Sequence, residues 1–117
     1  MKKIIKSSFL GIYLSFCLFS SAQAATIVVQ GNMQSEIQFL ADQLTEAKVA
    51  NVGPFLFYEG KVNNHTIVVS QTMIGAANAA VATYIAIDKY HPDLVINQGM
   101  AGGYINNLNV YDIVIAD

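Results

Sequence analysis

The hydrophobic and polar positions after residue 25 fall into blocks typical of strands and helices. Residues 26–30 form a β-branched run, which suits a strand buried on both faces of a parallel sheet. A helix is predicted over residues 37–47, where apolar side chains recur at helical spacing opposite a polar face. Ser35, with Gln38 three residues later, predicts a capping box at its start. The apolar face of this helix comprises Ile37, Leu40, Ala41, Leu44 and Ala47.

A hairpin is predicted next. Asn51 and Gly53-Pro54 mark a loop, and residues 55–60 and 66–70 have the composition of two strands joined by a turn at residues 62–64.

The remaining blocks predict a long helix and two more strands. Residues 75–90 are alanine-rich and apolar almost all round, which indicates a helix that is deeply buried or at an interface. His91-Pro92 ends it, and Leu94–Asn97 is expected to be a buried strand. Residues 111–116 look like a final strand. The alternation predicts an α/β domain with a mixed or mainly parallel sheet.

The first 24 residues have the organisation of a cleavable signal peptide. A basic segment, residues 1–6, precedes an apolar run over residues 9–19, and residues 20–24 supply the small residues that signal peptidase recognises. The run is shorter than the roughly 20 residues of a membrane span, which disfavours an anchor. A lipid-modified Cys17 is disfavoured because Phe16 stands where a small residue belongs. We expect cleavage after Ala24 and export, to the periplasm or beyond the cell.

Removal of the leader leaves an acidic domain, residues 25–117. The only cysteine, Cys17, leaves with the leader, so the remainder can form no disulfide. Three lysines, no arginine and eight acidic residues remain, which gives a net charge of −5. Such a chain lacks the basic surface that nucleic acids or anionic membranes require, so a small neutral or cationic substrate fits better. Because the sequence stops at a strand-like run, we expect the domain to be truncated at Asp117.

Two glycine-containing loops could carry chemistry, because ligands of α/β sheets bind beyond the carboxyl ends of the strands. They are residues 31–36 and residues 99–103, and each could equally be a tight turn without a ligand. Glu36 is their only carboxylate. It could simply favour the helix dipole, or it could be a general base that activates water. His65 and His91 have no neighbours at ligand spacing, so we expect neither a metal nor a cofactor.

Four segments, in order, resemble the 5′-methylthioadenosine/S-adenosylhomocysteine nucleosidases of the nucleoside phosphorylase superfamily. Residues 27–37 resemble the opening strand, glycine loop and catalytic glutamate of that family. Residues 57–70 resemble its hairpin, residues 72–80 its Gly-Ile-Gly-Lys helix start, and residues 92–117 its Asn-x-Gly-Ser-Ala-Gly-Gly segment and the following strand. The resemblance implies a three-layer αβα domain with a mixed central sheet, of which only the first half is present.

The resemblance also implies roles for individual residues. Glu36 corresponds to the catalytic glutamate that activates the attacking water. The substrate-binding positions are a methionine lining the ribose, an apolar wall beside the 5′ substituent, the position where the family usually has serine, and the backbone around sugar and base: Met33, Ile74, Met100, Ala101 and Gly102. Two further family residues, a glutamate that holds the ribose hydroxyls and an aspartic acid that protonates the purine, would lie beyond Asp117.

Hydrolysis of the N-glycosidic bond of a purine nucleoside, such as 5′-methylthioadenosine or S-adenosylhomocysteine, is therefore the expected activity, and we expect a homodimer. Phosphorolysis, the sister activity, fits less well because the first loop has no cation to hold phosphate. A nucleoside-binding protein without catalysis is the third alternative. Retention of Glu36 disfavours it, and Met100 in place of serine favours it.

Overall fold

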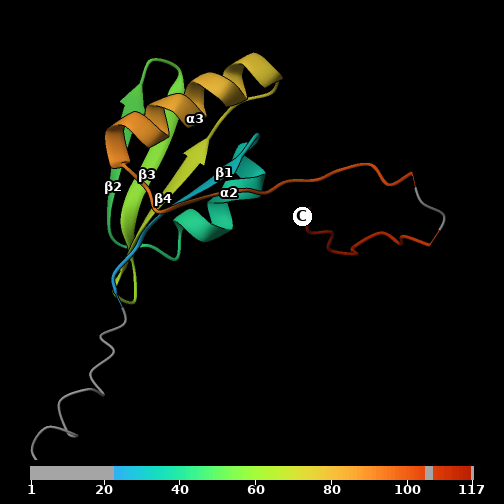
Figure 1. Cartoon of the computed structure of the whole chain (residues 1–117), viewed down its shortest axis with the longest axis horizontal. Helices are drawn as coiled ribbons and strands as arrows, with labels where there is room; N and C mark the ends of the chain where they lie inside the picture. The colour runs from blue at the N-terminus through green and yellow to red at the C-terminus, as the bar shows by residue number, and fades with distance from the viewer. Residues whose placement is uncertain (1–22, 105–106, 117) are drawn as a thin grey trace, which may run out of the picture.

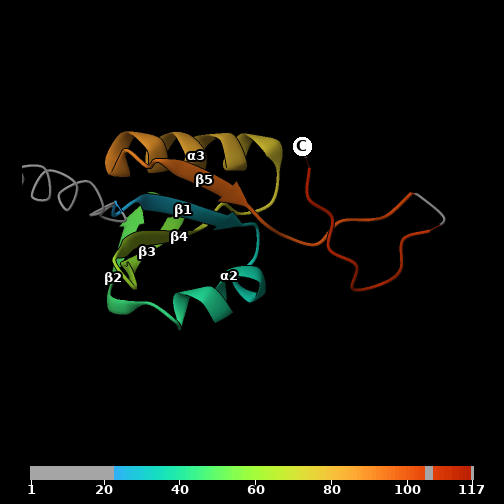
Figure 2. The same ribbon diagram turned by 60° about the horizontal axis from the view of Figure 1, so that its bottom comes forward.

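The computed structural model describes residues 23–104 and 107–116 and shows a three-layer α/β arrangement. A five-stranded sheet, of order β2-β3-β4-β1-β5, is covered by α2 on one face and α3 on the other (Figures 1 and 2). The expected signal peptide lies almost wholly outside the described residues. The elements are β1 (Thr26–Gly31), α2 (Gln34–Ala41), β2 (Thr45–Val52), β3 (Phe55–Val62), β4 (His65–Gln71), α3 (Ala76–Tyr90) and β5 (Leu94–Asn97). The predicted αβα layering and mixed sheet are confirmed.

The central strand β1 determines where the loops meet. It pairs in parallel with β4 on one side and β5 on the other, whereas β2, β3 and β4 pair antiparallel. Parallel neighbours end at the same edge of a sheet. The chain leaving β1 for α2, the chain leaving β4 for α3 and the segment after β5 therefore emerge together (Figure 2).

Alternate residues of the central strands contact opposite helices. Val28 of β1 packs in the cluster that contains Ala82 and Ala86 of α3, and Val29 packs in the cluster that contains Ile37 of α2. The small alanines allow α3 to approach the sheet closely. Burial of each large apolar side chain contributes about 1.5–3 kcal/mol, so these two clusters hold the three layers together.

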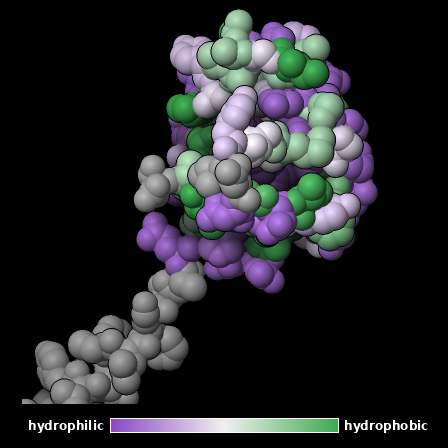
Figure 3. All heavy atoms as spheres, turned by 90° about the vertical axis from the view of Figure 1, so that its right-hand side faces the viewer, coloured by the Kyte–Doolittle hydropathy of each residue, from purple (hydrophilic) through white to green (hydrophobic). Residues whose placement is uncertain are grey.

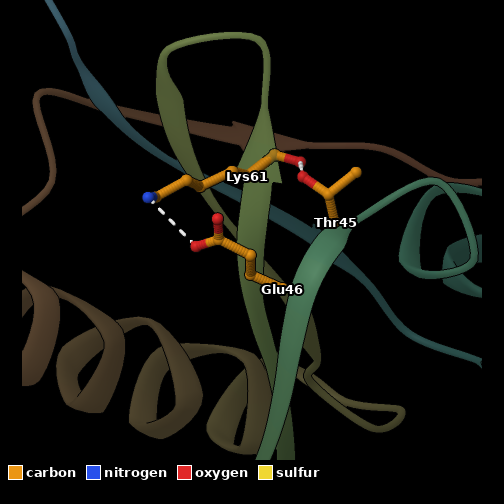
Figure 4. Close-up of polar contacts among 3 residues, drawn as sticks. All are labelled: Thr45, Glu46 and Lys61. Carbon is orange, nitrogen blue, oxygen red and sulfur yellow. Dashed lines mark hydrogen bonds and ion pairs between the residues drawn. The ribbon is translucent and has the colours of Figure 1, made fainter.

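The region after α2 differs from the prediction. The helix ends at Ala41 instead of continuing to Ala47, and β2, which the pattern did not predict, pairs antiparallel with β3. The apolar spacing continues past Ala41, but the ladder formed with β3 outweighs it. Beside a register shift in this ladder, Thr45 Oγ1 donates to the Lys61 carbonyl at 3.0 Å, and Lys61 Nζ lies 3.0 Å from Glu46 Oε2 (Figure 4). That ion pair is exposed, so it adds little stability.

The capping prediction is also wrong in detail. The N-cap position of α2 is Met33, which makes no side-chain capping hydrogen bond, and the Glu36 carboxylate accepts from the Met33 backbone N–H, so the predicted pair of Ser35 and Gln38 is not formed. The hairpin prediction is confirmed, with Asn63 in the left-handed region at the turn.

The end of α3 is confirmed, but its environment is more exposed than expected. His91 adopts a left-handed conformation at the C-cap, immediately before Pro92. Ala82 and Ala86 are buried, whereas Val81, Tyr84 and Ile87 are 49%, 69% and 49% exposed. The helix thus buries one face and leaves the other uncovered.

The last described residues are not a strand. Residues 98–104 and 107–116 have no helix or strand and are exposed, so the predicted strand over residues 111–116 is not formed. A strand is stabilised by pairing, and this segment lies away from the sheet (Figures 1 and 2). Leu94 and Ile96 of β5, at the sheet edge, are 51% and 42% exposed, so this predicted buried strand is only partly covered. None of the helices in the described residues is long and apolar enough to cross a membrane.

Candidate functional site

The carboxylate of Glu36 connects the two glycine-containing loops. Its Oε2 accepts hydrogen bonds from the backbone N–H groups of Asn32, at 2.7 Å, and Met33, at 3.0 Å. Its Oε1 accepts from the backbone N–H of Met100, at 3.2 Å, on the loop after β5. Residues that are 64 positions apart in the sequence are thereby brought together at the carboxyl edge of the sheet.

A second set of contacts holds the loop after β5 in place. The backbone N–H of Gln98 donates to the carbonyl of Gln30 at 2.8 Å, which extends the pairing of β5 with β1. The side-chain amide of Gln98 donates to the carbonyl of Glu36 at 2.9 Å. Gln98 therefore fixes the position of this loop relative to both β1 and α2.

Two glycines allow this close approach. A Cβ atom on Gly99 would lie 3.0 Å from Glu36 Oε1, and one on Gly31 would lie 2.7 Å from Ile37 Cγ2. The first contact is tighter than side chains normally tolerate, and the second would force a shift. The glycines are thus explained by the space that Glu36 and α2 occupy.

The backbone donors determine the charge state of Glu36. Hydrogen bonds from the N–H groups of Met33, Met100 and Asn32, of which that of Met33 has the largest effect, hold the pKa of the Glu36 carboxyl below its usual value, against the opposing effect of partial burial. The group is therefore ionised at neutral pH. A carboxylate has about four acceptor positions, and the three N–H groups occupy three of them. One position on Oε1 remains for a further donor, such as a water molecule.

The lowered pKa predicts how Glu36 affects stability as the pH changes. Because its pKa is lower in the folded than in the unfolded chain, its contribution is fully present above the unfolded value, near 4.5, and is lost as the pH falls through the folded value. Unfolding free energies of the wild type and Glu36→Gln, measured by denaturant titration across pH, should differ most above pH 4.5 and converge below it. A difference that is constant with pH would contradict this assignment.

Met33 and Ile74, two of the predicted substrate-binding residues, line the same pocket, which adjoins Glu36 through the loop residues Asn32 and Met33 but is not lined by Glu36 itself. Its volume is about 340 Å³, and its walls are Asn32, Met33, Gln34, Gln71, Met73, Ile74 and Asn78. Three of these side chains are apolar, four are amides and none is charged. The Ile74 side chain is 73% exposed, so the pocket opens to solvent.

Met100, Ala101 and Gly102, the other predicted substrate-binding residues, lie in the exposed loop after β5. Met100 and Ala101 line a second pocket, of about 540 Å³, with residues 108–112. The structure brings the Met100 backbone to Glu36 and leaves its side chain 77% exposed, whereas it gives no direct contact of Ala101 or Gly102 with Glu36. On this side of the molecule polar and apolar residues lie side by side (Figure 3).

The sequence pattern did not identify Gln98, Thr72 or Met73 as parts of the site. Thr72 is buried, and its backbone N–H donates to the Gly31 carbonyl at 2.9 Å, which joins the chain after β4 to the first loop. These three residues are recognisable only once the parallel register places the three strand ends together.

Among the described residues, neither a lysine nor a cluster of metal-ligating side chains lies at this site. Lys48, Lys61 and Lys89, the lysines of the described residues, line neither of the two pockets beside Glu36. Within residues 23–104 and 107–116, no three histidine, cysteine, aspartate or glutamate side chains come together as a metal site would require.

Comparison with known proteins gives consistent matches over the described domain. A 5′-methylthioadenosine/S-adenosylhomocysteine nucleosidase from Staphylococcus saprophyticus is 35% identical over 91 residues, which cover 78% of this chain and 40% of that protein. A protein of the same name from Exiguobacterium is 40% identical over 86 residues, which cover 74% and 37%. This chain therefore spans about 40% of the length of the curated relatives it matches.

Solved structures give the same result. The nucleosidase of that name from Colwellia psychrerythraea, in complex with adenine, superposes with a TM-score of 0.72 at 35% identity over 75% of this chain and 36% of that one. The nucleosidase from Neisseria meningitidis, in complex with methylthio-immucillin-A, has a TM-score of 0.71 at 38% identity over 73% and 37%. The model of the phosphorylase superfamily matches residues 26–117. The chain belongs to the phosphorylase superfamily.

Proposed function

We propose that the full-length protein hydrolyses the N-glycosidic bond of purine nucleosides such as 5′-methylthioadenosine or S-adenosylhomocysteine, and releases adenine. The observation that carries this proposal is the ionised Glu36, held by three backbone donors with one acceptor position left on Oε1. The relatives named as nucleosidases support the choice of substrate class.

In this proposal Glu36 is the general base. A water molecule that donates to Oε1 is oriented toward C1′ of the sugar, where cleavage of the bond to the purine leaves an oxocarbenium-like carbon. The water oxygen forms the new bond to C1′, its proton passes to Glu36, and the purine leaves with the electron pair of the broken bond. An acid that protonates the purine is required, and we place it outside residues 25–117.

The remaining site residues hold the substrate. We assign Met33 to the ribose, Ile74 to the 5′ substituent, and the backbone of Ala101 and Gly102 to the sugar and base. Met100 contributes its backbone N–H to Glu36, which does not require the hydroxyl of the serine that the family usually has. In this scheme residues 25–117 supply the amino-terminal part of the catalytic domain.

Adenine release from 5′-methylthioadenosine, measured with and without phosphate, tests the proposal. We expect release that does not depend on phosphate, because no lysine of the described residues lines the two pockets beside Glu36. Release that requires phosphate would show a phosphorylase, and binding without release would show a nucleoside-binding protein.

We also propose that the protein is a homodimer. The uncovered apolar residues of α3, Val81, Tyr84 and Ile87, support a contact with a second copy, because an apolar helix face of this kind marks an interaction surface. Sedimentation velocity should give the mass of two chains, and a monomer at micromolar concentration would contradict this proposal.

We further propose that the protein is exported and processed after Ala24. The basic segment, the short apolar run and the small residues before Ala25 support this. Mass spectrometry of the periplasmic or secreted fraction should find a mature terminus at Ala25. Retention of residues 1–24, or a lipid on Cys17, would contradict the proposal.

A further inference from the structure

Two polar side chains hold the start of β1 at the edge of the sheet opposite to Glu36 (Figure 2). The backbone N–H of Ala25, the residue before β1, donates to Nδ1 of His65 at 3.1 Å. The backbone N–H of Thr26 donates to Oδ2 of Asp93 at 2.8 Å. His65 begins β4 and Asp93 directly precedes β5, so both strands that flank β1 contribute one side chain.

Backbone contacts fix the same two residues. The Ala25 carbonyl accepts from the N–H of Thr66 at 3.0 Å, and the Thr26 carbonyl accepts from the N–H of Asp93 at 2.8 Å. Ala25 and His65 are half-buried, whereas Asp93 is exposed. Ala25, the residue that follows the expected cleavage position, is therefore already bonded to the edge of the sheet.

Cleavage after Ala24 changes the nitrogen that His65 contacts. In the uncut chain the nitrogen of Ala25 belongs to a peptide bond and has one neutral N–H donor. On hydrolysis the water oxygen bonds to the carbonyl carbon of Ala24, the C–N bond breaks, and its electron pair and the proton go to the Ala25 nitrogen. Near neutral pH the result is an α-ammonium group with three donors. Hydrogen bonds from an ionised donor are roughly twice as strong as those from a neutral one.

The charge of Asp93 also favours a cation at this position. Only three covalent bonds separate the backbone nitrogens of Ala25 and Thr26, so Asp93 Oδ2 lies within ~7 Å of the Ala25 nitrogen. Opposite charges at this separation attract each other near a protein surface. Because Asp93 is exposed, its contribution is expected to be smaller than that of His65.

We propose that His65 and Asp93 form a binding site for the α-ammonium group of Ala25 that processing creates, so that removal of residues 1–24 completes the fold at this edge of the sheet. The inference rests on the proposed export and processing, and it does not depend on the nucleosidase activity. The uncut chain offers His65 a single neutral donor, so it gains less stability from this contact than the processed chain.

Two forms of the otherwise full-length protein test the proposal, one that begins at Ala25 and one that begins at Ala24. The extra residue in the second form makes the Ala25 nitrogen a peptide nitrogen again and moves the ammonium group away from His65. Thermal unfolding near neutral pH should give a Tm about 2–4 °C higher for the form that begins at Ala25.

Variants of the two side chains show whether they carry this difference in Tm. His65→Asn keeps an acceptor, Oδ1, bonded to Cγ as Nδ1 is, and should keep the difference. His65→Leu has no acceptor and should lose most of it. Asp93→Asn should reduce the difference in part, because it keeps an acceptor for Thr26 but removes the charge. Asp112→Asn is the matched control, since Asp112 also accepts from a backbone N–H, at 2.7 Å, but lies in the segment after β5. It should leave the difference unchanged.

Equal Tm values of the two wild-type forms, or a difference that persists undiminished in both His65→Leu and Asp93→Asn, would overturn the inference. A mature terminus other than Ala25 in the exported protein would overturn it as well, because no ammonium group would then lie beside His65. None of these results bears on the nucleosidase function, which adenine release by the same preparations tests independently.

Discussion

Replacing Glu36 by glutamine is expected to lower the rate of adenine release from 5′-methylthioadenosine by about 10²- to 10⁴-fold in the full-length protein. Glutamine keeps the length of the side chain but cannot accept a proton from water at neutral pH. Its carbonyl oxygen can still accept from the N–H groups of Asn32 and Met33, while its NH₂ group would face the N–H of Met100. Steady-state kinetics at saturating substrate measures the loss of the base.

The structural contribution of Glu36 can be measured separately. Loss of the hydrogen bond to Met100 should reduce the free energy of unfolding by about 1 kcal/mol. The variant should therefore still be folded at assay temperatures well below its Tm. Binding of adenine should change little, because the pocket keeps its shape. If Glu36 only stabilises the start of α2, the variant will lose stability but release adenine at nearly the wild-type rate, and its assignment as a base will be wrong.

Substitution of Gly99 by alanine is expected to lower turnover by about 10²-fold, the cost of misplacing a reacting group by about 1 Å. The new Cβ would lie 3.0 Å from Glu36 Oε1, so either the carboxylate or the loop must move. Stability should fall by no more than the about 1 kcal/mol expected for loss of the Met100 hydrogen bond, because Gly99 itself is exposed. Turnover and Tm of the same preparation check both parts of this prediction.

Gly103→Ala provides the control within the same segment. Its Cβ would lie 3.4 Å from the end of the Leu108 side chain, an ordinary contact. Turnover near that of the wild type in Gly103→Ala, with a large loss in Gly99→Ala, would locate the effect at Glu36. Equal losses in both variants would instead show that neither glycine tolerates a side chain, whatever its distance from Glu36, and would contradict the steric argument.

The parts of the fold that local pattern predicted are those with a strong local signal. The β-branched residues of β1 and β4 and the alanine-rich α3, ended by His91-Pro92, all lie close to where the sequence placed them. The strand β2 was missed because Leu44 and Ala47 fit a helical spacing equally well. Its stability comes from the ladder with β3, which a local pattern does not contain. The prediction for residues 111–116 was wrong in the opposite way: a strand was expected and none is formed, because an apolar run without a pairing partner does not form a strand.

The site was only partly predictable for the same reason. Glu36 could be singled out because it follows a glycine loop at the start of a helix. Its contact with Met100 depends on the register of β1 against β5, and the role of Gln98 depends on that register too. The positive φ of Met73 could not be predicted from its residue type, because methionine rarely adopts this backbone conformation.

The central claim is that water, activated by Glu36, cleaves the bond between sugar and purine. Turnover of 5′-methylthioadenosine by the full-length protein in water enriched in ¹⁸O, with phosphate present, tests it most directly by mass spectrometry of the sugar product. We predict a free 5-methylthioribose that carries the label on C1′ in samples quenched within the first turnovers, before the anomeric oxygen of the free sugar exchanges with water. A sugar phosphate in place of labelled free sugar, or an intact nucleoside after prolonged incubation, would contradict the account.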